Sequence, residues 1–325
     1  MGYNAKDYVR IRNEFSNKYT VARQLAEERR AEIHGLIPEI LEIDRVLSRT
    51  GMDIMAVITS GRKDTGAAIA ELEARNNALI NKREDILLAN GYPADYTDVH
   101  YDCPKCGDTG YVDTVMCDCM KQALVKAGYE SSGLGHLIGK QTFDNFEYDY
   151  YCESDGERDK TKKCVSILRN FAENFNERTN VNFLLMGTTG LGKTHLSTAI
   201  AQKVIERGYD VLYVSAVSMM GDFEQNRFGG SYSSGSSNDV QRYYTCDLLI
   251  LDDLGTEVVN KFTQSYFYEV INTRINNAKP TIINTNLTMT DINSVYSERI
   301  SSRLLGEYAA MRFKGVDIRK QKLSR

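Results

Sequence analysis

The strongest constraint on how this 325-residue chain folds is a glycine-rich loop at residues 187–194, which reads GTTGLGKT. An apolar run at 181–186 precedes the loop, and a segment of helical character at 195–207 follows it and stops at Gly208. Glycines let backbone N–H groups close around a phosphate, and the N-terminus of the next helix favours negative charge. The pattern therefore predicts a strand, a phosphate-binding loop and a helix in succession, rather than an ordinary glycine turn.

Three more apolar runs follow, at residues 211–216, 247–253 and 280–286, and a helical segment lies at 261–277. Together with the run before the loop they predict an α/β fold, a parallel sheet flanked by helices. In such a sheet a nucleotide binds at the carboxyl ends of the strands. The run 280–286 ends in polar residues that are expected to reach a γ-phosphate.

Two carboxylates, Asp252 and Asp253, end the run at 247–253. In the loop, Lys193 is expected to reach the β- and γ-phosphates and the Thr194 hydroxyl to ligate Mg²⁺. Asp252 is expected to hold the same Mg²⁺ through water, and Asp253 to polarise the attacking water.

Four cysteines form two close pairs, which are Cys103 with Cys106 and Cys117 with Cys119. Two pairs separated by a ten-residue insert suit tetrahedral Zn²⁺, and four thiolates leave no open position for catalysis. A structural zinc is therefore predicted, against chance clustering or a redox pair.

The first 90 residues are rich in Glu, Arg, Lys, Leu and Ile, with apolar residues at helical spacing. They predict a helical hairpin of coiled-coil-like character. Pro38 is expected to break or kink its first arm, and turns are expected at residues 50–51 and 60–62. The hairpin is interpreted either as a plain helical bundle or as a module that docks another protein.

A length of 325 residues suggests two domains. The net charge of −4 excludes the overall positive charge typical of nucleic-acid-binding proteins, so any DNA contact must come from a local basic surface. No apolar run approaches the roughly 18 residues of a membrane span, and the first 30 residues are too charged for a signal peptide. A cytoplasmic location without membrane contact is expected. The predicted parts are 1–98, a helical partner-binding module; 99–127, the zinc-binding element; 128–140, a linker; and 141–325, an ATPase domain.

The ordered segments QTFDNF, GTTGLGKT, LLILDDLG, PTIINTNL, ERISSRL and FKGVDIR carry a family resemblance over residues 141–322. They resemble the AAA+ ATPases of the bacterial replicative helicase loaders, the DnaC/DnaI type, and the related transposition helpers of the IstB type. The cysteine element and helical module ahead of them resemble the DnaI-like and phage loaders more than the IstB helpers. The resemblance implies an AAA+ P-loop ATPase that uses ATP and Mg²⁺.

The same resemblance assigns roles to single residues. The nucleotide is held by Gly187, Thr188, Thr189, Gly190, Leu191, Gly192, Lys193, Thr194, Asp252 and Arg319, the last as second sensor. Asp253 is the water-polarising acid, and because it stands where the family usually has Glu, slow hydrolysis is implied. Asn286, or else Thr285, is the γ-phosphate sensor.

Arg303, with Arg299 as the alternative, is implied as the arginine finger presented to a neighbouring subunit's ATP. The alternative for Arg303 and Arg319 is a solvated helix surface. Phe143 and Phe146 are implied to lie near the adenine, although the segment 141–146 also reads as a strap across a domain edge.

The resemblance implies an ATP-dependent loader or accessory factor that places the replicative DNA helicase on single-stranded DNA. The helicase would bind the N-terminal module, and ATP would drive homo-oligomerisation. Two alternatives remain open: a transposition helper ATPase on duplex DNA, and a nucleotide-gated scaffold with little hydrolysis.

The segment 219–239, between the second and third strands, is rich in Ser and Gly and is predicted to be an exposed insertion. Phe223, Arg227, Phe228 and Tyr232 within it suit base stacking beside a cation. In the family this position resembles the element that grips single-stranded DNA, which favours that role over a plain loop.

Overall fold

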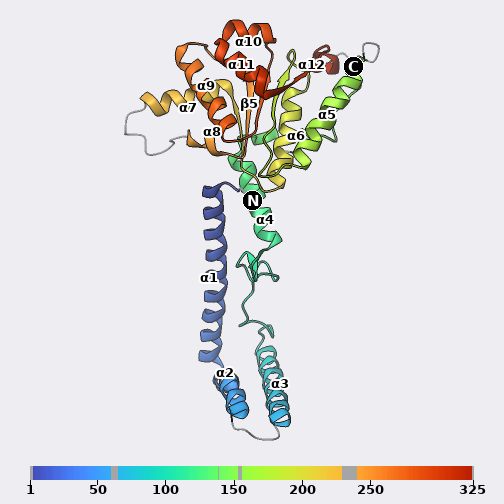
Figure 1. Ribbon diagram of the computed structural model, residues 1–325. Helices are drawn as coiled ribbons and strands as arrows, with labels where there is room; N and C mark the ends of the chain where they lie inside the picture. The colour runs from blue at the N-terminus through green and yellow to red at the C-terminus, as the bar shows by residue number, and fades with distance from the viewer. Residues whose placement is uncertain (1–2, 60–64, 138, 153–155, 229–239, 324–325) are drawn as a thin grey trace. The chain divides into compact units, whose positions relative to one another are not determined.

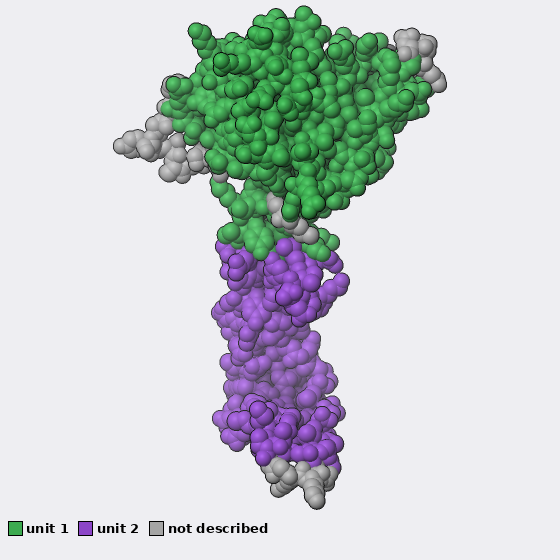
Figure 2. Space-filling model, in the orientation of Figure 1, with its two compact units in different colours: residues 1–11, 120–325 green, residues 12–119 purple. Residues whose placement is uncertain are grey.

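The computed structural model describes residues 3–59, 65–137, 139–152, 156–228 and 240–323. The chain divides into two compact units, one of residues 12–119 and one of residues 1–11 with 120–325 (Figure 2). The division falls inside two helices, α1 (Ala5–Leu36) and α4 (Asp118–Ser131). It does not coincide with the predicted limits, because residues 99–119 of the predicted zinc-binding element fall in one unit with most of the predicted helical module, and residues 120–127 fall in the other.

The unit of residues 12–119 consists mainly of long helices (Figure 1). After α1 come α2 (Pro38–Thr59), α3 (Thr65–Ala89), β1 (Tyr111–Val112) and β2 (Val115–Met116), the two strands pairing antiparallel. Ile33, Ile40 and Leu87 form a small core between the helices. The predicted helical character of this region is confirmed.

Pro38 marks a helix boundary, as predicted, but as the first residue of α2 rather than as a kink. A proline suits this position because its missing N–H has no partner there in any case. The turn predicted at residues 50–51 is wrong, since both residues lie inside α2. The turn predicted at 60–62 lies outside the described residues.

The second unit is built on a five-stranded sheet with the order β4-β5-β6-β3-β7, all neighbours parallel. Its strands are β3 (Asn182–Met186), β4 (Val211–Ser215), β5 (Leu248–Leu254), β6 (Thr281–Thr285) and β7 (Tyr308–Arg312). The predicted parallel sheet flanked by helices is confirmed. β7 was not predicted, because its short sequence, YAAMR, buries only Tyr308 and Met311 and carries little apolar signal.

Helices cover both faces of this sheet. After α4, the helices of this unit are η1 (Gly135–Leu137), α5 (Glu157–Glu173), α6 (Lys193–Glu206), α7 (Ala216–Phe228), α8 (Gln241–Thr245), α9 (Lys261–Asn276), α10 (Met289–Val295), α11 (Glu298–Glu307) and α12 (Ile318–Leu323). Phe183 and Leu185 of β3 pack into one core with α5 and α6, whereas Leu184 and Met186 pack into another with α7, α9 and α11. Successive side chains of β3 enter different cores because side chains along a strand point alternately to the two faces of the sheet. None of the described helices has the length and apolar character to cross a membrane.

Residues 128–140 are not the linker that was predicted. α4 continues to Ser131, and Leu134 is 2% exposed within the core that contains Phe183 and Leu185 of β3. The backbone N–H of Tyr213 in β4, the edge strand, donates to the Ser132 carbonyl at 2.7 Å, so this segment is hydrogen-bonded to the edge of the sheet. A buried leucine and a strand-edge hydrogen bond make the segment part of the folded unit.

Candidate functional site

The glycine-rich loop connects β3 to α6 at the carboxyl end of the sheet. Its shape requires glycine, because Gly190 has a φ of +79° and a Cβ there would lie 1.8 Å from Oδ1 of Asp317. A Cβ on Gly187 would lie 2.5 Å from the Phe313 carbonyl oxygen. The loop is thus packed directly against the C-terminal segment 313–318.

A pocket of about 310 Å³ opens beside the loop. The predicted site residues that line it are Thr189, Gly190, Leu191, Gly192, Lys193, Thr194, Asp253, Asn286 and Arg319. Phe146 also lines it, whereas Phe143 is 5% exposed in the core, with the Arg169 guanidinium 5.3 Å from its ring centroid. The fold therefore gathers most of the predicted nucleotide contacts, from five separate segments of the chain, around one cavity.

Lys193 spans the loop with its side chain. Its Nζ donates to the carbonyl oxygens of Gly187 at 2.6 Å and Thr188 at 2.9 Å, and to Oδ1 of Asn286 at 2.7 Å. Burial lowers the pKa of this lysine, while the charges of Asp253 and Asp252 act in the opposite direction. The cation and the predicted sensor thus meet at one point. Thr285, the alternative sensor, is buried and donates instead to the Leu254 carbonyl at 2.8 Å.

Asp252 is 8% exposed at the carboxyl end of β5. Its Oδ2 accepts hydrogen bonds from the Thr194 hydroxyl at 3.1 Å and the Tyr213 hydroxyl at 2.5 Å. Its Oδ1 accepts from Nδ2 of Asn284 at 2.8 Å. A carboxylate beside a threonine hydroxyl is an oxygen-donor set that fits Mg²⁺.

Asp253 takes the left-handed backbone conformation, with a φ of +56°. The β5–β6 register shifts between Leu251 and Leu254, so the strand is irregular at this acid. Such irregularities are frequent next to active sites, where they re-aim a side chain. Burial and then the charge of Asp252 raise the pKa of Asp253, and Lys193 opposes the rise.

Several residues of this region carry no motif and were not predicted from the sequence. His195, Tyr150 and Lys322 line the pocket. His195 Nε2 lies 2.7 Å from the Thr142 carbonyl oxygen, and its ring meets Phe146 edge-on at 5.2 Å. Burial lowers the pKa of His195, which favours a neutral imidazole at pH 7. Only the tertiary structure brings these residues together.

Arg303 lies on α11, away from the pocket lining, with NH1 4.0 Å from Oε1 of Glu307. Arg299 is on the same helix and is also absent from the lining. The arginine-finger assignment concerns a neighbouring subunit and stays a prediction.

The prediction that residues 219–239 form an exposed insertion is wrong for its first part. Met219, Met220 and Phe223 are at most 4% exposed and belong to the core beneath α7. Phe223 therefore cannot stack on a base. The Arg227 guanidinium lies 5.5 Å from the ring centroid of Phe262. Residues 229–239, including Tyr232, and the side chain of Phe228 lie outside what the structure describes.

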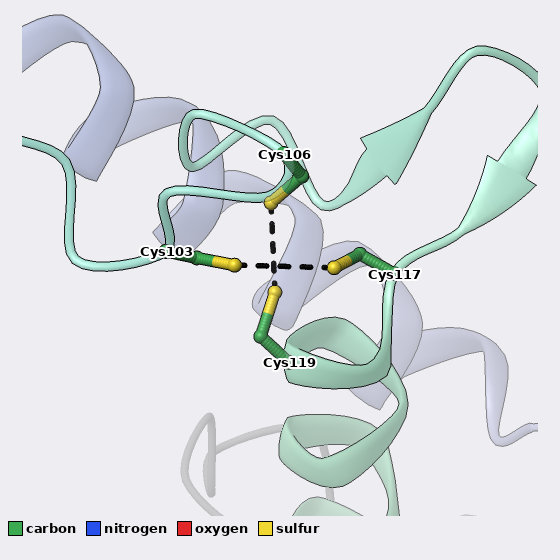
Figure 3. Close-up of side chains that lie close together, drawn as sticks. All are labelled: Cys103, Cys106, Cys117 and Cys119. Carbon is green, nitrogen blue, oxygen red and sulfur yellow. Dashed lines mark hydrogen bonds between the residues drawn. The ribbon is translucent and has the colours of Figure 1, made fainter.

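The four cysteines predicted as metal ligands converge on one point (Figure 3). Their Sγ atoms all lie within 4.8 Å of one another, with Cys103 to Cys117 at 3.9 Å and Cys106 to Cys119 at 3.6 Å. Tetrahedral zinc with bonds of about 2.3 Å places its sulfurs about 3.8 Å apart. Asp108 accepts the N–H groups of Asp102 and Cys103 at 2.8 Å, which supports the turn. The cluster fits a structural zinc.

The parallel sheet, the phosphate loop and the acids at the end of β5 define a P-loop ATPase fold of the AAA+ type. Residues 131–324 match the IstB-like ATP binding protein family, and the chain belongs to that family. This confirms the predicted relationship.

Curated relatives are similar over about half of the chain. The "Replicative helicase loader DnaC" of Buchnera aphidicola subsp. Acyrthosiphon pisum is 27% identical over 173 residues, 53% of this chain and 66% of that protein. The protein of the same name from Escherichia coli strain K12 is 25% identical over 177 residues, 54% of this chain and 67% of its own. The match therefore spans about two thirds of each relative's length. A solved structure, "Crystal structure of the DnaC helicase loader", overlaps 55% of this chain and all of its own at a TM-score of 0.45 and 20% identity.

Proposed function

We propose that this protein is an ATP-dependent loader or accessory factor that places a replicative DNA helicase on single-stranded DNA. The observation that carries the proposal is the convergence of Lys193, Asp253 and Asn286 on the pocket beside the phosphate loop. The relatives are named replicative helicase loaders, and that name supports the process proposed here. In this proposal ATP binding drives self-assembly and DNA contact, and hydrolysis releases the loader.

The proposed roles at the ATP site follow from position. Lys193 binds the β- and γ-phosphates, and Thr194 and Asp252 hold Mg²⁺, which offsets phosphate charge. Asp253 orients the attacking water, and Asn286 contacts the γ-phosphate once ATP separates it from Lys193. Arg319 approaches the same phosphates from the C-terminal segment. Arg303 acts as the arginine finger that contacts the ATP of a neighbouring subunit. Hydrolysis is slow because Asp253 is one methylene shorter than the usual Glu.

The proposal extends to the rest of the chain. The helical module of residues 1–98 binds the helicase, and the cysteines hold Zn²⁺ as a structural ion, which rigidifies the element at 99–127. DNA contact lies around residues 227–239, next to Arg227. The protein acts in the cytoplasm.

The family's own name favours a second candidate, a helper ATPase of the IstB type that works with a transposase on duplex DNA. Affinity capture of the tagged protein from its native cells, in ATP and Mg²⁺, distinguishes the two. Recovery of the replicative helicase supports the loader. Recovery of a transposase without the helicase contradicts it, and a Lys193→Ala variant run in parallel reports whether capture depends on ATP. Single-turnover hydrolysis tests the remaining alternative, a scaffold with little hydrolysis.

A further inference from the structure

The buried hydroxyl of Tyr213 lies against the carboxylate assigned to Mg²⁺. Tyr213 is on β4, the neighbour of β5, and is 9% exposed. Its hydroxyl donates to Oδ2 of Asp252 at 2.5 Å and lies 3.5 Å from the Ser197 hydroxyl. This is the short contact expected of a hydroxyl that donates to a charged oxygen.

The strand on the other side of β5 supplies a second donor. Asn284 of β6 is fully buried, and its Nδ2 donates to Oδ1 of Asp252 and to the Ser197 hydroxyl, both at 2.8 Å. Each oxygen of Asp252 is therefore held by a side chain from a different neighbouring strand. Donors on both oxygens restrict rotation of the carboxylate.

Tyr213 is itself held in place from the edge of the sheet. Its N–H donates to the Ser132 carbonyl at 2.7 Å, and a Cβ on Gly133 would lie 2.3 Å from the Tyr213 carbonyl oxygen. Its ring belongs to the core beneath α5 and α6. Because Tyr213 is held both at its backbone and at its ring, its hydroxyl cannot follow movements of the Asp252 carboxylate. The hydrogen bond between them therefore fixes the carboxylate.

We propose that Tyr213 is a positioning residue, which holds the Asp252 carboxylate in the orientation that serves Mg²⁺ beside Thr194. The proposal rests on the function proposed above, in which Asp252 is the magnesium ligand. It assigns Tyr213 no contact with nucleotide. Partners that orient a ligating carboxylate matter for metal affinity, and their loss typically costs 10- to 100-fold.

The test is Tyr213→Phe in the full-length protein, which removes one hydroxyl and keeps the ring. Tyr129→Phe is the matched control, because Tyr129 packs against the same core and its hydroxyl donates to Oε1 of Glu206 at 3.2 Å, outside the pocket lining. Asp252→Asn is the reference for loss of the ligand. Binding of N-methylanthraniloyl ATP is measured in EDTA and across a Mg²⁺ titration, with thermal unfolding and steady-state hydrolysis in parallel.

Tyr213→Phe is expected to bind the analogue in EDTA within about twofold of wild type and to need about tenfold more Mg²⁺ for half-maximal binding enhancement. Excess Mg²⁺ should restore kcat with KM unchanged, and Tyr129→Phe should match wild type throughout. If Tyr213→Phe needs no more Mg²⁺ than wild type while Asp252→Asn needs more, the positioning role is overturned and the proposed function stands. Equal weakening with and without Mg²⁺ also overturns it, because it marks a purely structural tyrosine. If Asp252→Asn itself leaves the requirement unchanged, the magnesium assignment fails as well.

Discussion

Lys193 offers the sharpest separation of function from stability, and Lys193→Met is the change that tests it. Methionine keeps an unbranched stem of similar length and removes the ammonium. In the structure that ammonium donates to two loop carbonyls and to Asn286, all within the site. The variant therefore removes the phosphate contact and leaves the packing of α6 almost unchanged.

The expected loss of ATP affinity follows from one charge-assisted hydrogen bond. Such a bond contributes about 1.5–3 kcal/mol, which corresponds to roughly 10- to 150-fold weaker binding. Stability should change little, because burial lowers the pKa of Lys193 and so disfavours its charged form in the folded protein, which offsets the loss of its three hydrogen bonds. An unfolding midpoint close to that of wild type is expected.

The pH dependence of stability gives an independent check. Because the folded-state pKa of Lys193 lies below its unfolded value, the unfolded chain binds more protons between the two pKa values. Wild-type stability relative to the variant should therefore rise as pH increases through that window, and any advantage of Lys193→Met should shrink at alkaline pH.

Isothermal titration with Mg²⁺-ATP and calorimetric unfolding are the two assays. Lys203→Met on the same helix is the control, since Lys203 pairs with Glu206 at 2.9 Å on the surface, where an ion pair contributes at most about 1 kcal/mol. Wild-type ATP affinity in Lys193→Met would refute the assignment of the phosphate site. A midpoint several degrees lower would show that Lys193 is structural.

Three more predictions test the function proposed above. Asp253→Asn should retain ATP but hydrolyse it more slowly in single-turnover assays, because the metal ligand is kept and the base is lost; equal turnover would remove Asp253 from this role. The purified protein should contain one equivalent of zinc by metal analysis, and Cys106→Ser should lower both zinc content and the unfolding midpoint; a metal-free native protein would contradict the structural site. Phe228→Ala should weaken binding to a labelled single-stranded oligonucleotide about tenfold in ATP, and Arg227→Ala should reduce the salt dependence of binding; wild-type anisotropy curves for both would exclude this contact.

The sequence alone determined the features that depend on near neighbours along the chain. The loop at 187–194, the four strands around it and the paired cysteines were all predictable, because glycine spacing, apolar runs and ligand spacing act over a few residues. The acids at the end of β5 were predictable for the same reason. In a parallel sheet the end of a buried run lies at the carboxyl edge, where the loop also lies.

Only the tertiary structure decided which distant residues meet. The lateral order β4-β5-β6-β3-β7 places Tyr213 and Asn284 on either side of Asp252, and no spacing along the chain encodes that order. The tertiary structure also decided which residues are buried, since Phe223 stands in a polar, glycine-rich sequence yet packs from α7 against Tyr266 of α9 and is 2% exposed. A strand or helix can be read from its period, but the surface it packs against is set by the free energy of burying every apolar face of the domain at once.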